Sequence, residues 1–404
     1  MTDDRRWRDA TVDLLERTRL SEPDALPAEV NAALRALEVD VTIYLIDYEQ
    51  EALRPVPEAG RPLPQPLPVE STLAGRAFMA IEVMSGAARP GTNDPAVLWM
   101  PLLDGSERLG VLAIRADERA LTSPDFRRHC DLFAALLGHL VATKDPYGDT
   151  LERTRRSQPM SVASELLWKV LPPLTYACER FVISALFAPR YEVGGDGFDY
   201  AVDDGTAFLC LLDTTGHGLA AGLGTAVALS TLRASRRAGA GLYAMARAVD
   251  HTFEEQFSDS RFTTAVLATL DFDTGLLRYI NAGHPQPAVL RNGRVVRRLT
   301  GGRRMPLGLD DPQIEVAEEL LQPGDRLLLF SDGVVEARDR TGAPFGEQRL
   351  LDLAERQAFA ELPAPETLRR LGRAVAGHLD GPPADDATLM LVEWSAAAAH
   401  RSLP

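Results

Sequence analysis

Acidic residues in the second half of the sequence stand beside glycines at the ends of apolar runs, where they could bind metal ions. Asp213 and Asp332 each come after a run of strand-forming apolar residues, and Asp196 and Asp385 stand in Gly-Gly-Asp-Gly and Asp-Asp-Ala-Thr. Hard divalent cations such as Mg²⁺ and Mn²⁺ prefer carboxylate and backbone oxygens as ligands. Carboxylates that meet at strand ends would repel one another unless a cation neutralised them. The pattern therefore predicts a divalent-metal site.

Each of these acidic clusters has a simpler interpretation when it is taken alone. An Asp-Gly pair after a strand is commonly just a turn, because Asp caps its own backbone and Gly adopts positive φ. Short motifs also match by chance. Four such clusters in one region, each at a strand end with glycine near it, favour a shared site over four separate turns.

These aspartates need a scaffold, and the pattern of the region from residue 181 onward predicts an antiparallel α+β layered fold. Strand patterns follow one another without intervening helices, and helical patterns come in pairs, which is not the order of repeated βαβ units. The expected strands are 181–187, 207–212, 264–270, 277–281, 286–290, 326–330 and 388–392. The expected helices are 219–237, 242–257, 347–358 and 365–378.

Several longer motifs in this region stand in one order and spacing that is similar to a known family. They are Gly-Gly-Asp-Gly-Phe-Asp at 194–199, Asp-Thr-Thr-Gly-His-Gly at 213–218, Phe-Thr-Thr-Ala at 262–265, Asn-Ala-Gly-His-Pro at 281–285, Pro-Leu-Gly-Leu at 306–309, Ser-Asp-Gly-Val-Val-Glu at 331–336 and Asp-Asp-Ala-Thr at 385–388. On these motifs, residues 177–393 resemble the SpoIIE-type, metal-dependent PP2C-like serine phosphatases, which include RsbU-like stress regulators. The resemblance implies an α-β-β-α sandwich of antiparallel sheets.

The resemblance also implies a reaction and a set of site residues. The chain would be a PPM/PP2C-type protein serine/threonine phosphatase that binds two Mn²⁺ or Mg²⁺ ions. Asp213 would bridge the ions, with the backbone carbonyl of Thr214 completing one coordination sphere. Asp332 and Asp385 would hold the first ion and Asp196 the second. A hydroxide shared by two metals would attack phosphorus in line, without a phospho-enzyme. The implied substrate is a phosphorylated anti-sigma-factor antagonist of the STAS type.

The sequence departs from the family pattern in three places. Gly197 replaces the bulky aromatic residue that commonly follows Gly-Gly-Asp, and the stretch after the bridging aspartate reads Thr214-Thr215-Gly. The phosphate-binding arginine of the eukaryotic branch has no match. Because all the acidic ligand positions are present, we expect an active enzyme.

Other polar residues near these motifs have a structural interpretation and a functional one. His217 could act as an acid toward the leaving group, but we expect hydrogen-bonding roles for it and for His284. We expect Asp199 and Asp386 to be hydrogen-bond acceptors or turn caps, and Glu336 to pair locally.

Two other functions are consistent with parts of the sequence. Gly-Gly-Asp-Gly-Phe superficially resembles the diguanylate cyclase signature, but Gly197 occupies its acidic fourth position and the clusters at Asp332 and Asp385 would have no role. The chain could instead be a catalytically inactive, partner-binding homologue of the phosphatases, which would bind no divalent metal.

The first 145 residues show a helix–strand–strand–loop–strand–strand–helix order that resembles a GAF domain, which implies a sensor for a small molecule or protein activator. The expected domains are 1–145 (GAF-like sensor), 146–175 (helical linker), 176–396 (phosphatase) and 397–404 (tail). The amphipathic linker could pair across a homodimer and transmit the state of the sensor to the metal site.

Composition limits the partners and the compartment. The 404 residues carry a formal net charge of −15, which argues against nucleic-acid binding because phosphate neutralisation needs clustered Lys and Arg. No run approaches the roughly 20 apolar residues that span a bilayer. The N-terminus lacks the order of a secretory signal, and three scattered cysteines suit a reducing compartment. We therefore expect a cytoplasmic protein without nucleic-acid or membrane partners.

Overall fold

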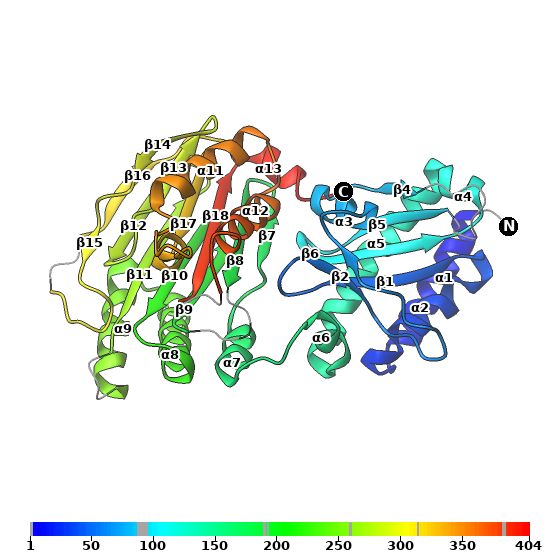
Figure 1. Cartoon of the computed structure of the whole chain (residues 1–404), viewed down its shortest axis with the longest axis horizontal. Coiled ribbons are helices and arrows are strands. Elements are labelled where there is room, and N and C mark those ends of the chain that lie inside the picture. Colours follow the sequence, from blue (N-terminus) through cyan, green and yellow to red (C-terminus); the bar gives the residue numbers. More distant parts are fainter. Residues whose placement is uncertain are drawn as a thin grey trace. The chain divides into compact units, whose positions relative to one another are not determined.

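The computed structural model describes residues 3–86, 96–188, 191, 194–257, 261–312, 315–381 and 385–404. The chain divides into two compact units, Met1–Gln158 together with Arg401–Pro404, and Pro159–His400 (Figure 1). The division falls inside the segment 146–175 that was predicted to be a linker. Among the described residues, no helix has both the length and the apolar character needed to cross a bilayer.

The N-terminal unit contains a six-stranded antiparallel sheet in the order β3-β2-β1-β6-β5-β4. Its strands are β1 (Asp40–Ile46), β2 (Ala52–Pro55), β3 (Leu67–Pro68), β4 (Met84–Gly86), β5 (Val97–Asp104) and β6 (Glu107–Arg115). Its α-helices are α1 (Asp3–Thr18), α2 (Leu26–Leu34), α3 (Leu73–Ala80), α4 (Glu118–Thr122), α5 (Pro124–Lys144) and α6 (Thr150–Arg155).

Helices cover both faces of this sheet. Successive residues of a strand point to opposite faces, and in these strands the residues that point to either face are largely apolar. In β1, Val41 and Ile43 pack with residues of α1, α2 and α5, whereas Tyr44 and Ile46 pack with residues of α3. The helix expected after Ser123 is present as α5, and the Ser123 hydroxyl accepts from a backbone N–H of its first turn. A helix-covered antiparallel sheet is consistent with a GAF-like domain, which stays a prediction.

The predicted linker contains two helices that belong to different units. α6 is counted with the N-terminal unit, and α7 (Val162–Val170) with the C-terminal unit. Leu167 of α7 is completely buried in the core of the C-terminal unit, so the apolar stripe of this helix is internal to that unit. The predicted tail likewise begins as helix α13 (Ala396–His400), in which Ala398 and Ala399 are buried.

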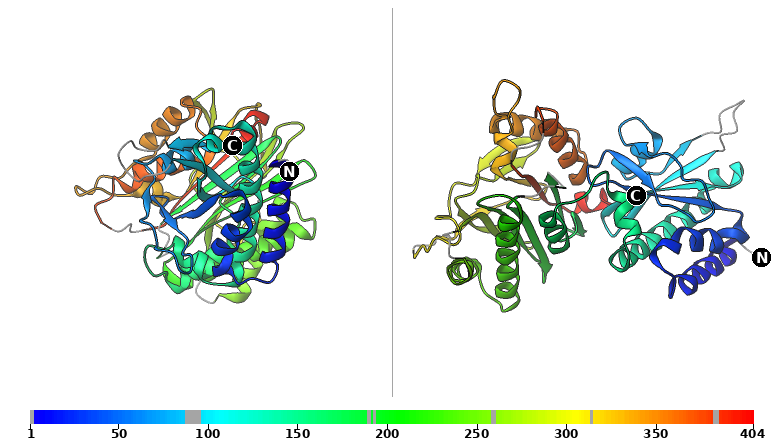
Figure 2. Two further views of the ribbon diagram at one scale, coloured as in Figure 1. Left: turned by 90° about the vertical axis from the view of Figure 1, so that its right-hand side faces the viewer. Right: turned by 60° about the horizontal axis from the view of Figure 1, so that its bottom comes forward.

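The C-terminal unit is built on two sheets with helices on their outer faces (Figures 1 and 2). One sheet has the order β15-β12-β11-β10-β9 with β16 beside β12, and the other has the order β14-β13-β17-β18-β8-β7. The first sheet contains β9 (Asp196–Asp203), β10 (Thr206–Thr214), β11 (Thr263–Asp271), β12 (Leu276–Ala282), β15 (Arg303–Arg304) and β16 (Ala317–Leu320). The second contains β7 (Thr175–Cys178), β8 (Phe181–Ala188), β13 (Ala288–Arg291), β14 (Arg294–Arg298), β17 (Arg326–Phe330) and β18 (Ala387–Trp394).

Two helical layers enclose these sheets. α8 (Gly218–Arg237) and α9 (Leu242–Gln256) pack on the first sheet, and α11 (Glu347–Phe359) and α12 (Ala364–Ala376) on the second (Figure 2). Strand β8 shows why the second sheet is buried on both faces: Phe181 and Ile183 belong to the core shared with the first sheet, and Val182 to the core under α11 and α12. The predicted α+β class with antiparallel sheets is confirmed.

The predicted strands and helices from residue 181 onward are all present, with ends that shift by a few residues. The expected elements did not include β9, which begins at Asp196, the short helices α10 (Asp332–Glu336) and α13, or the strands β14, β15 and β16. Asp and Gly are depleted in strands, so the local signal for β9 is weak. Pairing with β10 along its whole length holds it in the sheet.

Candidate active site

Two of the four predicted aspartates face each other across neighbouring strands of the first sheet. Asp196 is the first residue of β9, and in the antiparallel register it lies directly opposite Asp213, near the end of β10. Residues directly opposite in such a pair have Cβ atoms about 4.5–5.5 Å apart. The two carboxylates are therefore neighbours by the register of the sheet alone.

The other two aspartates stand at the adjacent ends of a strand pair in the second sheet. β17 and β18 are antiparallel, with Phe330 opposite Leu389. Asp332 therefore comes just after the end of β17, as the first residue of α10, and Asp385 comes just before the start of β18. Both are brought to the same end of this strand pair although 53 residues separate them in the sequence.

Hydrogen bonds to Asp196 join the two sheets at this point. The hydroxyls of Ser331 and Thr388 donate to Asp196 Oδ2 over 2.7 and 2.6 Å. Ser331 follows β17, Thr388 lies in β18, and all three side chains are buried. Neither hydroxyl was among the predicted site residues, although Ser331 stands next to Asp332 and Thr388 two residues after Asp386, inside two of the motifs.

Asp386 supports the loop before β9. Its Oδ2 accepts hydrogen bonds from the backbone N–H groups of Gly194, over 2.6 Å, and of Asp196, over 3.1 Å. The expectation that Asp386 is a hydrogen-bond acceptor agrees with this geometry. Burial, opposed by these two backbone bonds, raises the pKa of Asp386 to about 7.

The predicted ligands raise one another's pKa values. Burial and then the charges of Asp332, Asp385 and Asp386 raise the pKa of Asp213 to about 7. Burial and then Asp385 raise the pKa of Asp332, and burial with the charges of Asp213 and Asp386 holds the pKa of Asp196 well above its ordinary value. Nearby like charges and desolvation both disfavour the ionised form.

The donor set fits a hard divalent cation in its chemistry and its charge. In the described part of the chain, neither the four predicted aspartate ligands nor Asp386 forms an ion pair with Lys, Arg or His. Among the same residues, however, no three Asp, Glu, His or Cys side chains are arranged so that they could hold one ion together. The carboxylates nevertheless lie close enough to raise one another's pKa values, and they supply the oxygen ligands that Mg²⁺ and Mn²⁺ prefer.

The Thr214 carbonyl, the predicted backbone ligand, lies against the loop that carries Asp196. Thr214 is the last residue of β10, and its N–H donates to the Gly195 carbonyl over 3.0 Å. A Cβ at position 195 would lie 1.9 Å from the Thr214 carbonyl oxygen, so only glycine allows this approach.

The remaining polar residues have supporting positions. Asp199 is paired with Arg233 and Arg236 of α8, which agrees with its predicted role as an acceptor. His284 is buried: its Nδ1 lies 2.8 Å from the Thr264 hydroxyl, and burial lowers its pKa to about 3. His217 is the exposed N-terminal cap residue of α8, without a side-chain capping bond.

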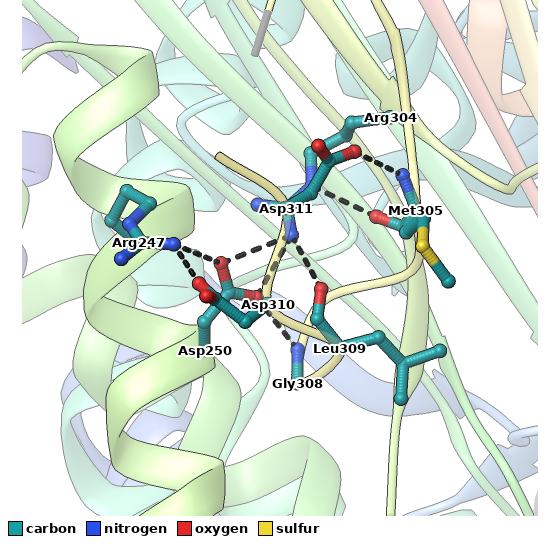
Figure 3. Close-up of polar contacts among 8 residues, drawn as sticks. All are labelled: Arg247, Asp250, Arg304, Met305, Gly308, Leu309, Asp310 and Asp311. Carbon is teal, nitrogen blue, oxygen red and sulfur yellow. Dashed lines mark hydrogen bonds and ion pairs between the residues drawn. The ribbon is translucent and has the colours of Figure 1, made fainter. Parts of the chain in front are cut away.

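A buried ion pair holds the loop 304–311 against α9 (Figure 3). Arg304 Nη2 lies 2.9 and 3.0 Å from the two carboxylate oxygens of Asp250, and the same carboxylate accepts from Gly308 N–H over 2.8 Å. On the surface above it, Arg247 pairs with Asp310. Within this loop, Leu307 exchanges two backbone hydrogen bonds with Thr263 at the start of β11. The motif Pro-Leu-Gly-Leu therefore serves to position this strand.

An antiparallel α-β-β-α sandwich with acidic residues at the facing strand ends defines the PP2C-like class. Residues 203–395 match the family model described as Stage II sporulation protein E (SpoIIE). This matched segment, which makes up most of the C-terminal unit, is a SpoIIE-type PP2C-like domain. Asp213, Asp332 and Asp385 lie inside the matched segment, and Asp196 lies seven residues before it.

Comparison with individual proteins gives distant relatives. The chain is 24% identical over 273 residues to Protein IcfG of Synechocystis sp., covering 60% of this chain and 42% of the relative. It is 24% identical over 164 residues to Phosphoserine phosphatase RsbP of Bacillus subtilis, which covers 39% of this chain and 40% of that relative. The solved SiaA-PP2C domain of Pseudomonas aeruginosa is 23% identical with a TM-score of 0.49, covering 62% of this chain and 98% of that one. The chain thus spans less than half the length of these two curated relatives, and no comparison supports a diguanylate cyclase.

Proposed function

We propose that the chain is a divalent-metal-dependent protein serine/threonine phosphatase whose active site is the carboxylate cluster. The observation that carries the proposal is the meeting of Asp196, Asp213, Asp332 and Asp385 at the facing ends of two sheets. Three of them lie inside the segment that matches the SpoIIE model and Asp196 lies just before it, and none has a cationic partner in the described part of the chain. Asp196 is buried, and a buried carboxylate without a compensating charge is costly. A bound cation is the simplest compensation for it and for the three aspartates beside it.

The residues of the chain have distinct tasks in this proposal. Asp213, Asp332, Asp385, Asp196 and the carbonyl of Thr214 would hold two Mn²⁺ or Mg²⁺ ions. Such ions would supply an activated water and neutralise the phosphate oxygens. Ser331 and Thr388 hold the Asp196 carboxylate in one orientation, and Asp386 holds the backbone on either side of Gly195. These contacts preorganise the site, so that little rearrangement is needed during the reaction.

The substrate and the regulation belong to the same proposal. The resemblance to RsbU-like regulators suggests a phosphorylated STAS-type anti-sigma-factor antagonist as substrate, in the cytoplasm. The N-terminal unit would act as the GAF-like sensor for a small molecule or protein activator. A homodimer would transmit its state to the active site. The name of the relative RsbP as a phosphoserine phosphatase supports the reaction.

The reaction is tested by phosphate release from a serine-phosphorylated STAS protein of the same organism, with and without Mn²⁺. We expect Mn²⁺-dependent release that is removed by EDTA. Asp213→Asn and Asp332→Asn should each lower the rate by more than about 100-fold, because changing even the hydrogen-bond partner of a metal ligand costs about 10–100-fold. Retention of full activity in both variants would contradict the metal site.

Asp273→Asn is the matched control, because this aspartate is exposed on a hairpin of the same unit and pairs only with Arg180 on the surface. Its activity should stay near that of the wild type. Mn²⁺ binding without phosphate release from any serine-phosphorylated protein would favour the inactive, partner-binding homologue.

A further inference from the structure

Three buried threonine hydroxyls form a continuous chain beneath the predicted metal ligands. Thr225 Oγ1 lies 2.8 Å from Thr214 Oγ1, which lies 2.8 Å from Thr263 Oγ1. Thr225 also donates to the carbonyl of Gly195. All three threonines are at most 1% exposed. Thr225 is the donor in both of its contacts, to the Gly195 carbonyl and to Thr214 Oγ1, and the two acceptors share the one hydrogen of this hydroxyl.

The chain joins three separate elements. Thr225 belongs to α8, Thr214 to the end of β10 and Thr263 to the start of β11. Its fourth member, Gly195, precedes Asp196 in the sequence, and its carbonyl accepts both the Thr225 hydroxyl and the Thr214 N–H. Two backbone positions of the predicted metal site are therefore tied to one side chain of α8.

Two glycines let α8 come close enough for these contacts. A Cβ at Gly197 of β9 would lie 2.4 Å from Thr225 Cγ2, and a Cβ at Gly224 would lie 2.8 Å from Thr214 Cγ2. A β-carbon never approaches another atom so closely without displacement, so larger residues would push α8 away from the strands. Gly197, which departs from the family pattern, thus leaves the space that the methyl group of Thr225 occupies.

We propose that Thr225 is a positioning residue for the metal site. Its hydroxyl bonds to the Gly195 carbonyl and to the Thr214 hydroxyl, and so it fixes the backbone from which the Thr214 carbonyl and the adjacent Asp196 would present their oxygens to the ion. This inference rests on the proposed metal-dependent function. The physical basis is general: groups that hydrogen-bond to metal ligands and their backbone orient the ligands and set the affinity for the metal.

The test is calorimetric titration of the full-length protein with MnCl₂, for the wild type, Thr225→Val and Thr225→Ser. Valine keeps the branched shape of threonine but loses the hydroxyl, and serine keeps the hydroxyl. We expect Thr225→Val to bind Mn²⁺ at least about 10-fold more weakly. Thr225→Ser should stay within a few-fold of the wild type. Equal binding by the valine variant would overturn the proposal.

Thr231→Val is the matched control, because Thr231 lies on the same helix and its hydroxyl donates to the Val227 carbonyl, within α8. It should bind Mn²⁺ as the wild type does. If Thr225→Val does not fold, Thr214→Val decides, since it removes the middle hydroxyl of the chain and should weaken binding similarly. A wild-type protein that binds no Mn²⁺ would refute the proposed function itself, whereas normal binding by a folded Thr214→Val variant would refute only this role of the hydroxyls.

Discussion

The aspartates of the C-terminal unit differ in what surrounds their carboxylates, whether these are buried, as in Asp199 and Asp250, or half-buried, as in Asp213 and Asp332. Asp199 and Asp250 are paired with arginines, and they support the packing of α8 and α9. Asp213 and Asp332 have no such partner in the described residues, and burial together with neighbouring carboxylates raises their pKa values. The same type of side chain therefore contributes to packing in one place and is available for the proposed metal site in the other.

His284 gives a prediction about pH at this scale. Burial lowers its pKa to about 3 in the folded protein, below the ordinary value of 6.5. The unfolded chain therefore binds a proton that the folded protein excludes, and the free energy of unfolding should fall as the pH drops from about 6.5 toward 3. This group alone contributes up to about 1.4 kcal/mol per pH unit.

Urea denaturation of metal-free protein between pH 7 and pH 4 tests this prediction. His284→Gln should lose less stability over the range than the wild type, whereas His251→Gln, at an exposed position of α9, should behave as the wild type does. Parallel curves for the wild type and His284→Gln would show that the histidine is not buried in its neutral form.

At the scale of elements, the site depends on helices and loops that are held against strand ends. The loop 304–311 is anchored to α9 by the pair Arg304–Asp250, whose side chains are 0% and 5% exposed. Removing one partner of a buried pair leaves an uncompensated charge and costs about 3–5 kcal/mol. Asp250→Asn should therefore lower the free energy of unfolding by about that amount.

Guanidinium denaturation measures the effect, and Glu318→Gln is its control. That substitution breaks an exposed pair with Arg278, whose side chains are 52% and 56% exposed, and exposed pairs contribute only about 0–1 kcal/mol. Similar small losses in both variants would contradict the role given to the buried pair.

The close approach of α8 to β9 predicts a steric effect. Gly197→Ala should destabilise the protein by about 1–3 kcal/mol, as overpacking of a filled core does, because Thr225 is held by its hydrogen bonds and cannot turn away. Adding Thr225→Ser should recover part of the loss, since it removes the methyl group that the new Cβ meets.

Gly222→Ala makes the matched comparison for this variant. A Cβ there meets its neighbours at an ordinary 3.6 Å, and Ala is favoured over Gly in a helix by up to about 1 kcal/mol. We expect this variant to be as stable as the wild type or more so. Thermal melting ranks the stabilities of Gly197→Ala, the double variant with Thr225→Ser, and Gly222→Ala. A Gly197→Ala variant as stable as Gly222→Ala would contradict the close packing of α8 against β9.

At the scale of the whole molecule, the chain consists of two units with separate cores. Each of the four hydrophobic clusters is made of residues from one unit. Two of the clusters lie within residues 7–151, and the other two lie within 163–399. A segment with its own core can fold alone. We expect fragments 1–158 and 159–400 each to show a cooperative thermal transition by circular dichroism, and a fragment 159–400 without one would contradict the division.

Much of the fold of the C-terminal unit could be predicted from the sequence, because its strands and helices carry strong local patterns. The run 327–330 is apolar throughout and is indeed buried on both faces, within β17. The site aspartates could also be singled out, since glycines and apolar strands flank them. β9 and α10 could not be predicted, because Asp and Gly have little preference for either element and only pairing or packing places them there.

The sequence by itself determined which residues could carry the chemistry, since residue type and flanking pattern set the chemistry of a ligand and the element that presents it. Only the tertiary structure decided which of them meet. Asp196 and Asp213 face each other because of a strand register, and Asp385 joins Asp332 because β17 and β18 are antiparallel. The local sequence pattern also could not identify the supporting hydroxyls of Ser331, Thr388 and Thr225. Their partners lie between 30 and 192 residues away in the chain, and contacts at such separations depend on how the sheets and helices pack.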